Sequence, residues 1–269
     1  MTPDEPRYAL ELDPGEVERY RMMAEQARAA EAGLWDLAGI GPGASVADVG
    51  CGPGAMLPAL SGAVGPEGRV QAVDADPEAV AAATALVAAA GLGNVSVAQA
   101  RADHTGLAPG SLDVVMVRHV LAHNGGAEDA IVAHLATLVR PGGCLYLVDS
   151  DGTAFRTLPE HADLTDLNDR YGAFRAARGD DNRAGLRLAD RVARAGLELL
   201  EFSGRYFIGQ PPAAIRPPSW AAREAMVAAG VATEDDVRRW DRAFQEVEAA
   251  PVPRTVFAPL FTAIGRRPA

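Results

Sequence analysis

The chain has 269 residues, enough to bury the core of one large domain with or without a cap. Its formal net charge is −11 and it has no arginine-rich block, which argues against nucleic acid as a substrate or partner. The 25 basic residues are all arginines, and the lack of lysine excludes Schiff-base and lysine general-base chemistry. Without a signal segment or a run of about 18 apolar residues, the sequence predicts a cytoplasmic protein with no membrane partner.

The first half of the chain alternates predicted helices and strands. An N-terminal helix has apolar residues at helical spacing over 17–34 and is expected to end near 39–43. Further helices are expected from about Ala55, over 77–91 and over 128–139, at proline and glycine signals. Strands are predicted at Ser45–Val49, Arg69–Asp74, Val95–Ala100, Leu112–Val117 and Leu145–Val148. This alternation predicts an open, doubly wound sheet.

The second half is less regular. It contains a predicted helix at 186–195, a strand at 197–202, two helices at 220–229 and 234–249, and a last strand at 256–264. Together the two halves predict an α/β fold with a doubly wound, Rossmann-like sheet of seven strands. We expect this sheet to be mostly parallel, with the last strand antiparallel, and to carry an N-terminal helix and a helical insertion that form a cap.

The stretch from Val46 to Ala55 is the most informative motif of the chain. It indicates a buried strand that ends in a carboxylate and turns through three glycines into a helix, whose first N–H groups can bind a ligand. Gly50 and Gly52, with Asp74 at the end of the second strand, satisfy the dinucleotide fingerprint. A carboxylate at Asp74 suits the ribose of NAD and of S-adenosylmethionine alike. Alternatively, the glycines form only a tight turn and Asp74 only caps it.

Three features favour the sulfonium cofactor over the dinucleotide. Asp48 stands two residues before the first glycine, where a carboxylate suits an ammonium and a sulfonium better than a pyrophosphate. The second feature is the spacing from the glycine turn to residues 111–115 and 138–143. The third is the strand pattern at 257–267, which follows a long insertion and could add an antiparallel strand to the sheet.

Five segments together resemble the class I S-adenosylmethionine-dependent methyltransferases. Within this class they are similar to the small-molecule branch of bacterial secondary metabolism, related to the ubiquinone and menaquinone methyltransferases. The segments are 46–55, 70–76, 110–117, 118–123 and 139–147. We then expect a single domain in which 1–43 forms an N-terminal helical cap, 44–150 a cofactor-binding core and 206–253 a helical insertion over the acceptor pocket.

The resemblance implies roles for residues of the cofactor site. Gly50 and Gly52 would let the backbone pass beside the methionine moiety, and Asp48 would hold its ammonium group directly or through water. Asp74 would bind the ribose. Arg118 would flank the methionine carboxylate, although a salt bridge to a surface carboxylate would also explain this arginine.

The adenine contact departs from the family pattern. An acidic residue usually meets the adenine amine 12 positions before the aspartate that Asp113 matches, and here that position holds Arg101. Arginine cannot accept a hydrogen bond. The backbone N–H of Ala102 could still bond an adenine ring nitrogen, and Asp103 could replace the missing acid. Whether Arg101 or Asp103 contacts adenine stays open.

The implied reaction is methyl transfer to a small, aromatic or heterocyclic metabolite by in-line displacement, with S-adenosylhomocysteine as the product. Such a transfer needs positioning and at most one proton acceptor, rather than a triad or a metal. His119 and His123 follow the fourth strand and are the candidate bases, while Tyr20 could act at the acceptor atom. A half-exposed histidine at a helix start and a packing tyrosine are the alternatives.

Other interpretations of the sequence are kept open. Asp163, Asp166 and Asp169 share a helical face and could bind Mg²⁺, but a solvated acidic face is the simpler interpretation, and no metal is expected. An NAD-dependent oxidoreductase, or a cofactor-binding relative that does not methylate, would also use the glycine turn. The sequence does not specify whether oxygen, nitrogen or carbon is methylated, and it is compatible with a homodimer.

Overall fold

An eight-stranded sheet organises residues 14–269, the part of the chain that the computed structural model describes, with side chains described from residue 19 onward. The strand order is β3-β2-β1-β4-β5-β8-β6, and β7 pairs with β8. The strands are β1 (Ser45–Val49), β2 (Arg69–Asp74), β3 (Val95–Gln99), β4 (Leu112–Arg118), β5 (Val139–Ser150), β6 (Arg156–Leu158), β7 (Glu198–Gly209) and β8 (Thr255–Arg266). Strands β1 to β5 are parallel, and β8 is antiparallel to its neighbours β5, β6 and β7. The mostly parallel sheet with an antiparallel last strand is confirmed.

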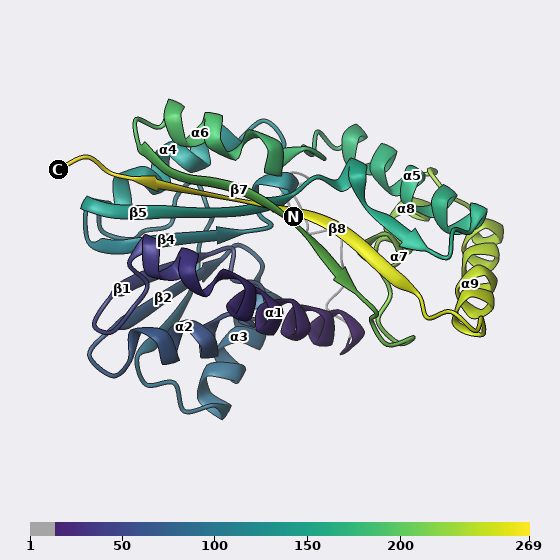
Figure 1. The fold of residues 1–269 in the computed structure, drawn as a ribbon, viewed down its shortest axis with the longest axis horizontal. Helices are drawn as coiled ribbons and strands as arrows, with labels where there is room; N and C mark the ends of the chain where they lie inside the picture. Colours follow the sequence, from purple (N-terminus) through teal and green to yellow (C-terminus); the bar gives the residue numbers. More distant parts are fainter. Residues whose placement is uncertain (1–13) are drawn as a thin grey trace.

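Helices cover both faces of this sheet, with α1, α2 and α3 on one side and α4 and α6 on the other (Figure 1). Their bounds are α1 (Pro14–Ala38), α2 (Leu57–Val64), α3 (Pro77–Ala89), α4 (Glu128–Leu138), α5 (Ala162–Ala177), α6 (Leu188–Arg194), α7 (Pro218–Ala221), α8 (Arg223–Ala228) and α9 (Glu234–Glu248). Within the described residues, none of these helices is both long and apolar enough to cross a bilayer.

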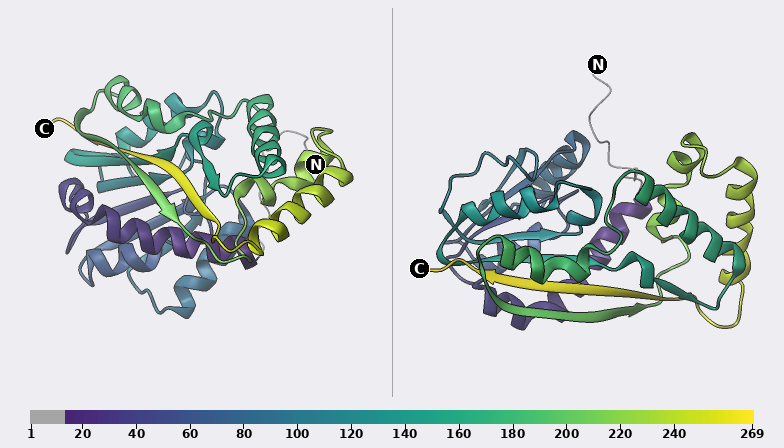
Figure 2. Two further views of the ribbon diagram at one scale, coloured as in Figure 1. Left: turned by 45° about the vertical axis from the view of Figure 1, so that its right-hand side comes forward. Right: turned by 90° about the horizontal axis from the view of Figure 1, so that it is seen from above.

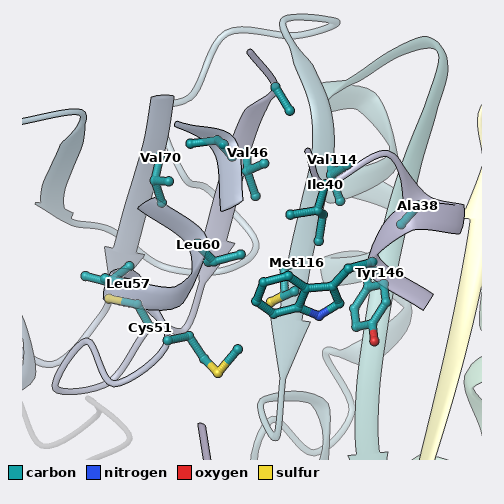
Figure 3. Close-up of a cluster of buried hydrophobic side chains, with 14 of the residues drawn as sticks. Ala38, Ile40, Val46, Cys51, Leu57, Leu60, Val70, Val114, Met116 and Tyr146 are labelled. Atoms are coloured by element: carbon teal, nitrogen blue, oxygen red, sulfur yellow. The ribbon is translucent and has the colours of Figure 1, made fainter. Parts of the chain in front are cut away.

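Two apolar clusters sandwich the sheet, and alternate residues of a strand belong to different clusters. Val46, Val114 and Met116 belong to the cluster on the side of α1 and α2 (Figure 3), and Trp35 of α1 is part of the same cluster. The neighbouring residues of β1 and β4, by contrast, face α4 and α6 on the opposite side. All five residues of β1 are buried, as expected for a parallel strand with helices on both faces.

A third cluster lies at one end of the sheet. We call α5, α7, α8 and α9 the helical lobe, because they enclose their own core around Trp240, Phe244 and Phe174. Figure 2 shows this lobe beyond the core of the sheet, on the side toward which β7 and β8 extend. Helix α9 begins with a capping box, in which the side chains of Thr233 and Asp236 each accept the other's backbone N–H.

Several predicted boundaries were wrong. The sheet has eight strands rather than seven within the described residues, because the short β6 pairs with the first residues of β8. Residues 206–209 continue β7, so the irregular insertion starts later than expected. The helix after the glycine turn begins at Leu57 rather than near Ala55, and the helix predicted at 220–229 is split into α7 and α8.

Strand β5 also begins earlier than the sequence indicates. The Pro141-Gly142-Gly143 segment was expected to end a helix and precede the strand, but it lies inside β5. The strand accommodates it with an irregularity in the pairing with β4, where the partner of Leu112 is Val139 and that of Val114 is Cys144. An added Cβ at Gly143 would stand 2.6 Å from the Asp113 carbonyl oxygen, so this close approach requires glycine.

Candidate active site

The glycine turn lies where β1 ends, at the carboxyl edge of the parallel strands. Gly50, Gly52 and Gly54 all have positive φ, at 74°, 54° and 84°. An added Cβ on Gly50 would lie 2.2 Å from Cγ2 of Val120, whereas one on Gly52 would meet nothing within 4 Å. Gly50 is therefore required by protein packing, and the backbone at Gly52 borders open space that a ligand could fill.

Asp48 places a buried carboxylate beside this turn. Its side chain is only 2% exposed, and its Oδ2 atom has no hydrogen-bond partner among the residues that the structure describes. Burial raises the pKa of Asp48 to about 7, with the nearby Asp74 charge adding to the shift and the Arg118 charge opposing it. A buried carboxylate of this kind is costly to the fold unless a cation completes it.

Asp74 ends β2 on the other side of the glycine turn. Its Oδ2 accepts the backbone N–H of Gly52 at 2.8 Å, and its Oδ1 accepts that of Asp76 at 3.0 Å. Burial raises the pKa of Asp74, while these hydrogen bonds act in the opposite direction. Because each carboxylate oxygen can accept more than one hydrogen bond, Asp74 keeps capacity for ribose hydroxyls.

Arg118 is the last residue of β4, and its guanidinium is bound to Glu31 of α1. Nη1 donates to Oε2 of Glu31 at 2.6 Å and Nη2 to Oε1 at 3.2 Å. The sequence offered a surface salt bridge as the alternative role of this arginine, but Glu31 is fully buried. Arg118 itself is 10% exposed, so this ion pair belongs to the interior.

The residues at the predicted adenine position form a local exposed pair. Nε and Nη2 of Arg101 each donate to the carboxylate of Asp103 at 2.9 Å. The Arg101 side chain is 60% exposed, and the backbone of Arg101 forms an isolated bridge with His104. Ala102 lies in the turn that this bridge closes.

The two candidate histidines differ sharply. His119 has a positive φ of 56°, and its buried Nε2 has no hydrogen-bond partner within the described part of the chain. Burial lowers its pKa to about 3. Its imidazole is therefore neutral at ordinary pH. His123 is half-buried, and its Nδ1 lies 3.7 Å from Oδ2 of Asp180, within ion-pair range but longer than a hydrogen bond. Asp180 is also held by Nε of Arg175 at 3.2 Å.

Tyr20 lies in α1, which spans the same side of the sheet as Asp48 and Arg118. The side chain is half-buried, and the Arg19 guanidinium carbon lies 4.8 Å from the centroid of its ring. The charge of Arg19 also acts to lower the pKa of His119. The start of α1 and the end of β4 are thus close enough to interact electrostatically.

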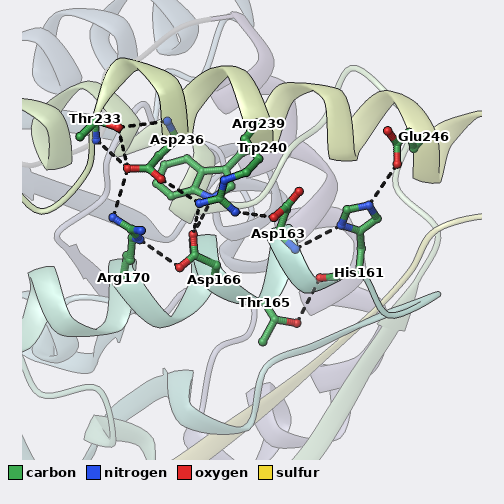
Figure 4. Close-up of polar contacts among 10 residues, drawn as sticks. All are labelled: His161, Asp163, Thr165, Asp166, Arg170, Thr233, Asp236, Arg239, Trp240 and Glu246. Atoms are coloured by element: carbon green, nitrogen blue, oxygen red, sulfur yellow. Dashed lines mark hydrogen bonds and ion pairs between the residues drawn. The ribbon is translucent and has the colours of Figure 1, made fainter.

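Two carboxylates of the acidic face of α5, those of Asp163 and Asp166, are bound by arginines. Arg239 of α9 bonds to Asp163 and, at 2.7 Å, to Asp166, which also accepts the indole N–H of Trp240 at 3.0 Å (Figure 4). Arg170 adds a bond to Asp166 at 3.0 Å. Among the described residues, no group of acidic, histidine or cysteine side chains is arranged to hold a metal ion.

Sequence reasoning missed the buried partners of the site. Glu31 accepts bonds from Arg118, from the Tyr146 hydroxyl at 2.7 Å and from Arg205 at 2.6 Å. A signal was present, because Glu31 falls on the helical face of α1 that otherwise buries apolar residues. Asp180 carried no such signal, since its contact with His123 comes from the tertiary fold alone.

Comparison with known proteins agrees with this arrangement. A family model for a methyltransferase domain matches residues 46–143. Nocamycin O-methyltransferase of Saccharothrix syringae is 38% identical over 114 residues, which are 42% of this chain and 40% of that protein. The chain spans about two fifths of the length of the curated relatives it matches.

Solved structures extend the likeness beyond the glycine turn. A SAM-dependent methyltransferase from Aquifex aeolicus has a TM-score of 0.50 and 21% identity, over 71% of this chain and 92% of that one. The [4+2]-cyclase SpnF has a TM-score of 0.57 and 15% identity, over 99% of this chain and 89% of that one. The protein therefore has the fold of the class I S-adenosylmethionine-dependent methyltransferases, and its residues 46–143 are similar to the methyltransferase domain family.

Proposed function

We propose that the protein is an S-adenosylmethionine-dependent methyltransferase that acts on a small molecule. The observation that carries this proposal is the unpartnered Oδ2 of Asp48, buried beside the open side of the glycine turn. A pyrophosphate would bring more negative charge to this carboxylate, whereas the ammonium of the methionine moiety would neutralise its charge and donate a hydrogen bond to it. The charge at Asp48 thus favours the sulfonium cofactor over NAD.

The remaining residues of the turn fit the same ligand. Gly52 leaves room for the methionine moiety to lie against the backbone, and Asp74 can accept ribose hydroxyls alongside its two backbone N–H donors. Arg118 would flank the methionine carboxylate, and the Ala102 N–H would bond the adenine ring. Because Arg101 and Asp103 pair with each other, the proposal assigns no adenine contact to either side chain.

When bound, S-adenosylmethionine supplies an activated methyl group, and breaking its S–CH₃ bond leaves the neutral thioether S-adenosylhomocysteine. The protein then has mainly to hold the acceptor in line, a contribution of about 7–11 kcal/mol in well-oriented reactions. Of the two histidines, His123 suits the role of proton acceptor better, because Asp180 faces its Nδ1. His119, with its low pKa, is a poor base and would serve as a neutral hydrogen-bonding group.

The acceptor is proposed to be an aromatic or heterocyclic metabolite bound between α1 and the helical lobe. The half-buried rings of Tyr171 and Trp220 in that lobe supply surface for such a molecule. Similarity to nocamycin O-methyltransferase supports a small-molecule acceptor, whereas its aromatic or heterocyclic nature rests on these rings alone. In this proposal residues 210–253, which follow β7, contribute the cover of the acceptor pocket, and α1 contributes its other wall.

Isothermal titration calorimetry tests the cofactor assignment. We expect S-adenosylmethionine and S-adenosylhomocysteine to bind and NAD not to bind. Asp74→Ala should weaken the binding of S-adenosylhomocysteine more than tenfold. The control is Asp76→Ala, which removes a neighbouring carboxylate that caps α3 and should leave the affinity within about threefold of that of the wild type. Binding of NAD without binding of S-adenosylhomocysteine would overturn the proposal.

Turnover needs a separate test, because SpnF shows that a cyclase shares this fold. Purified protein is incubated with S-adenosylmethionine and a panel of phenols, indoles and amines, and release of S-adenosylhomocysteine is measured. We expect at least one acceptor to be methylated and His123→Asn to lower kcat while cofactor affinity is kept. Cofactor binding without release on any acceptor would favour a non-methylating protein.

A further inference from the structure

Glu31 is a fully buried carboxylate in the middle of α1. Its neighbours on the buried face of that helix are apolar, among them Ala27 and Trp35. Burial alone would raise the pKa of Glu31, but the charge of Arg118 and the hydrogen bonds around the carboxylate bring it below its ordinary value. The group is therefore a buried anion, which a fold tolerates only when its partners are well placed.

Four hydrogen bonds from three strands converge on this carboxylate. Oε2 accepts from Nη1 of Arg118 at 2.6 Å and from the hydroxyl of Tyr146 at 2.7 Å. Oε1 accepts from Nη2 of Arg118 at 3.2 Å and from Nη2 of Arg205 at 2.6 Å. The two bonds to Arg118 are bidentate, which fixes the plane of the guanidinium as well as its position. Glu31 thus ties α1 to β4, β5 and β7.

The guanidinium that Glu31 holds lies on the cofactor side of the sheet. Asp48 of β1 pairs in register with Met116, and Arg118 is two residues further along β4, so both side chains face α1. The charge of Arg118 also opposes the rise in the pKa of Asp48 that burial causes. Two arginines and one glutamate also leave the cluster with one positive charge in excess.

This charge pattern matches the amino-acid end of the proposed cofactor. A methionine moiety carries an ammonium and a carboxylate on one carbon atom, and the end of the sheet offers an unpartnered carboxylate at Asp48 beside an arginine. An arginine side chain on its own has several flexible bonds and would lose entropy on binding. Held by two bonds to Glu31, Arg118 has already lost that freedom before any ligand arrives.

We propose that Glu31 is a positioning residue, which holds the Arg118 guanidinium in place to receive the carboxylate of the cofactor's methionine moiety and so makes cofactor binding depend on the docking of α1. The inference rests on the proposed function. Its competitor is a purely structural role, in which the four hydrogen bonds only attach α1 to the sheet. The two roles make different predictions for Glu31 variants. A positioning role predicts a selective loss of binding to the amino-acid end of the cofactor, whereas a structural role does not.

The test compares two ligands that differ at the amino-acid end. S-adenosylhomocysteine carries that end, and 5′-methylthioadenosine lacks it but keeps the adenosine. In Glu31→Gln we expect the affinity for S-adenosylhomocysteine to fall at least tenfold and that for 5′-methylthioadenosine to change by less than threefold. Arg118→Lys, which keeps the charge but not the bidentate geometry, should repeat this pattern if Glu31→Gln fails to fold.

Tyr146→Phe is the matched control. It removes one hydrogen bond from Glu31 but leaves both bonds to Arg118, so it should lower the melting temperature without a selective loss of S-adenosylhomocysteine. Equal losses of both ligands in Glu31→Gln, or no loss of either, would overturn the positioning role. If the wild-type protein itself does not bind S-adenosylhomocysteine, the proposed function fails rather than this inference.

Discussion

At the scale of single residues, the site contains polar groups that the protein alone leaves unsatisfied. Oδ2 of Asp48 and Nε2 of His119, at the ends of β1 and β4, are both buried, and neither has a hydrogen-bond partner among the described side chains and backbone. Most buried polar atoms in folded proteins are satisfied, and each exception costs free energy of folding. Their position at the carboxyl edge of parallel strands, where such folds bind ligands, indicates that a ligand supplies the missing partners.

Replacing Asp48 should therefore separate stability from binding. Because the folded protein raises the pKa of Asp48 from 3.8 to about 7, it holds this proton more tightly than the unfolded chain does. Stability from this group is present at low pH and lost as pH rises through 7. In urea titrations, Asp48→Asn should gain stability relative to wild type as pH rises, so its free energy of unfolding minus that of wild type should be larger at pH 8.5 than at pH 5.5 by about 2 kcal/mol.

The same variant should bind S-adenosylhomocysteine at least tenfold more weakly at pH 8.5, because an amide cannot replace the carboxylate that faces the ammonium. An equal stability difference at both pH values would show that Asp48 is ionised throughout. Unchanged affinity would remove Asp48 from the cofactor site.

Substitution of Gly50 should mainly lower stability, whereas substitution of Gly52 should mainly weaken ligand binding. Gly50→Ala places a Cβ 2.2 Å from Val120 Cγ2 at positive φ, so we expect a loss of about 2–4 kcal/mol in the free energy of unfolding. Gly52→Ala meets no atom and should cost only about 1–2 kcal/mol of stability. The added methyl group projects into the open side of the turn, so Gly52→Ala should weaken the binding of S-adenosylhomocysteine more than tenfold, as measured by calorimetry. Reversed effects would mean that the ligand does not lie against Gly52.

At the scale of elements, helix α9 is attached to α5 by a charged cluster. Arg239 bonds to three carboxylates, those of Asp163, Asp166 and Asp236. Removal of this guanidinium would leave three negative charges together, whereas the apolar core beneath would stay in place. The cluster therefore specifies how α9 lies on α5, and the apolar core supplies most of the free energy of packing.

Arg239→Met should loosen α9 locally. The side chain is one third exposed, so we expect a loss of about 1–2 kcal/mol, seen as faster amide hydrogen exchange in α9 with little change in β1. Arg238→Met is the control, since the Arg238 side chain is 61% exposed. Within the described residues its ion-pair partner is Asp235 of the same helix, so it does not attach α9 to α5. Equal effects of both variants would mean that the cluster does not attach the helix.

The comparison of sequence and structure is also a matter of elements. Elements with local signals were predicted closely, such as β1 and β2, whose bounds match, and α3, which begins at residue 77 as predicted. The early start of β5 could not be predicted, because only the pairing with β4 keeps a Pro-Gly-Gly segment in a strand. In the site, the glycine turn and Asp48 are visible in the sequence because their spacing is local. The partners Glu31 and Asp180 come from distant segments, so no spacing predicts them.

At the scale of the whole molecule, two strands connect two separately built cores. The clusters on the two faces of the sheet share no residue with the cluster inside the helical lobe. Long strands β7 and β8 run from the sheet toward that lobe, as Figures 1 and 2 show. A cofactor at the glycine turn touches only the first of these units, whereas an acceptor between α1 and the lobe would touch both.

The two units should therefore respond differently to the cofactor. At a concentration of S-adenosylhomocysteine 100 times its Kd, the free energy of opening of amides in β1 and β4 should rise by about 2.7 kcal/mol, because the ligand binds only the folded site. The free energy of opening of amides in α9 should rise by much less, since a lobe with its own core can open while the cofactor stays bound. Hydrogen exchange followed by mass spectrometry measures both regions at once, and Asp74→Ala with the same ligand concentration is the control that should show a reduced rise. An equal rise in α9 would instead show that the sheet and the lobe unfold together, and the helical cover could then open only when the cofactor site does.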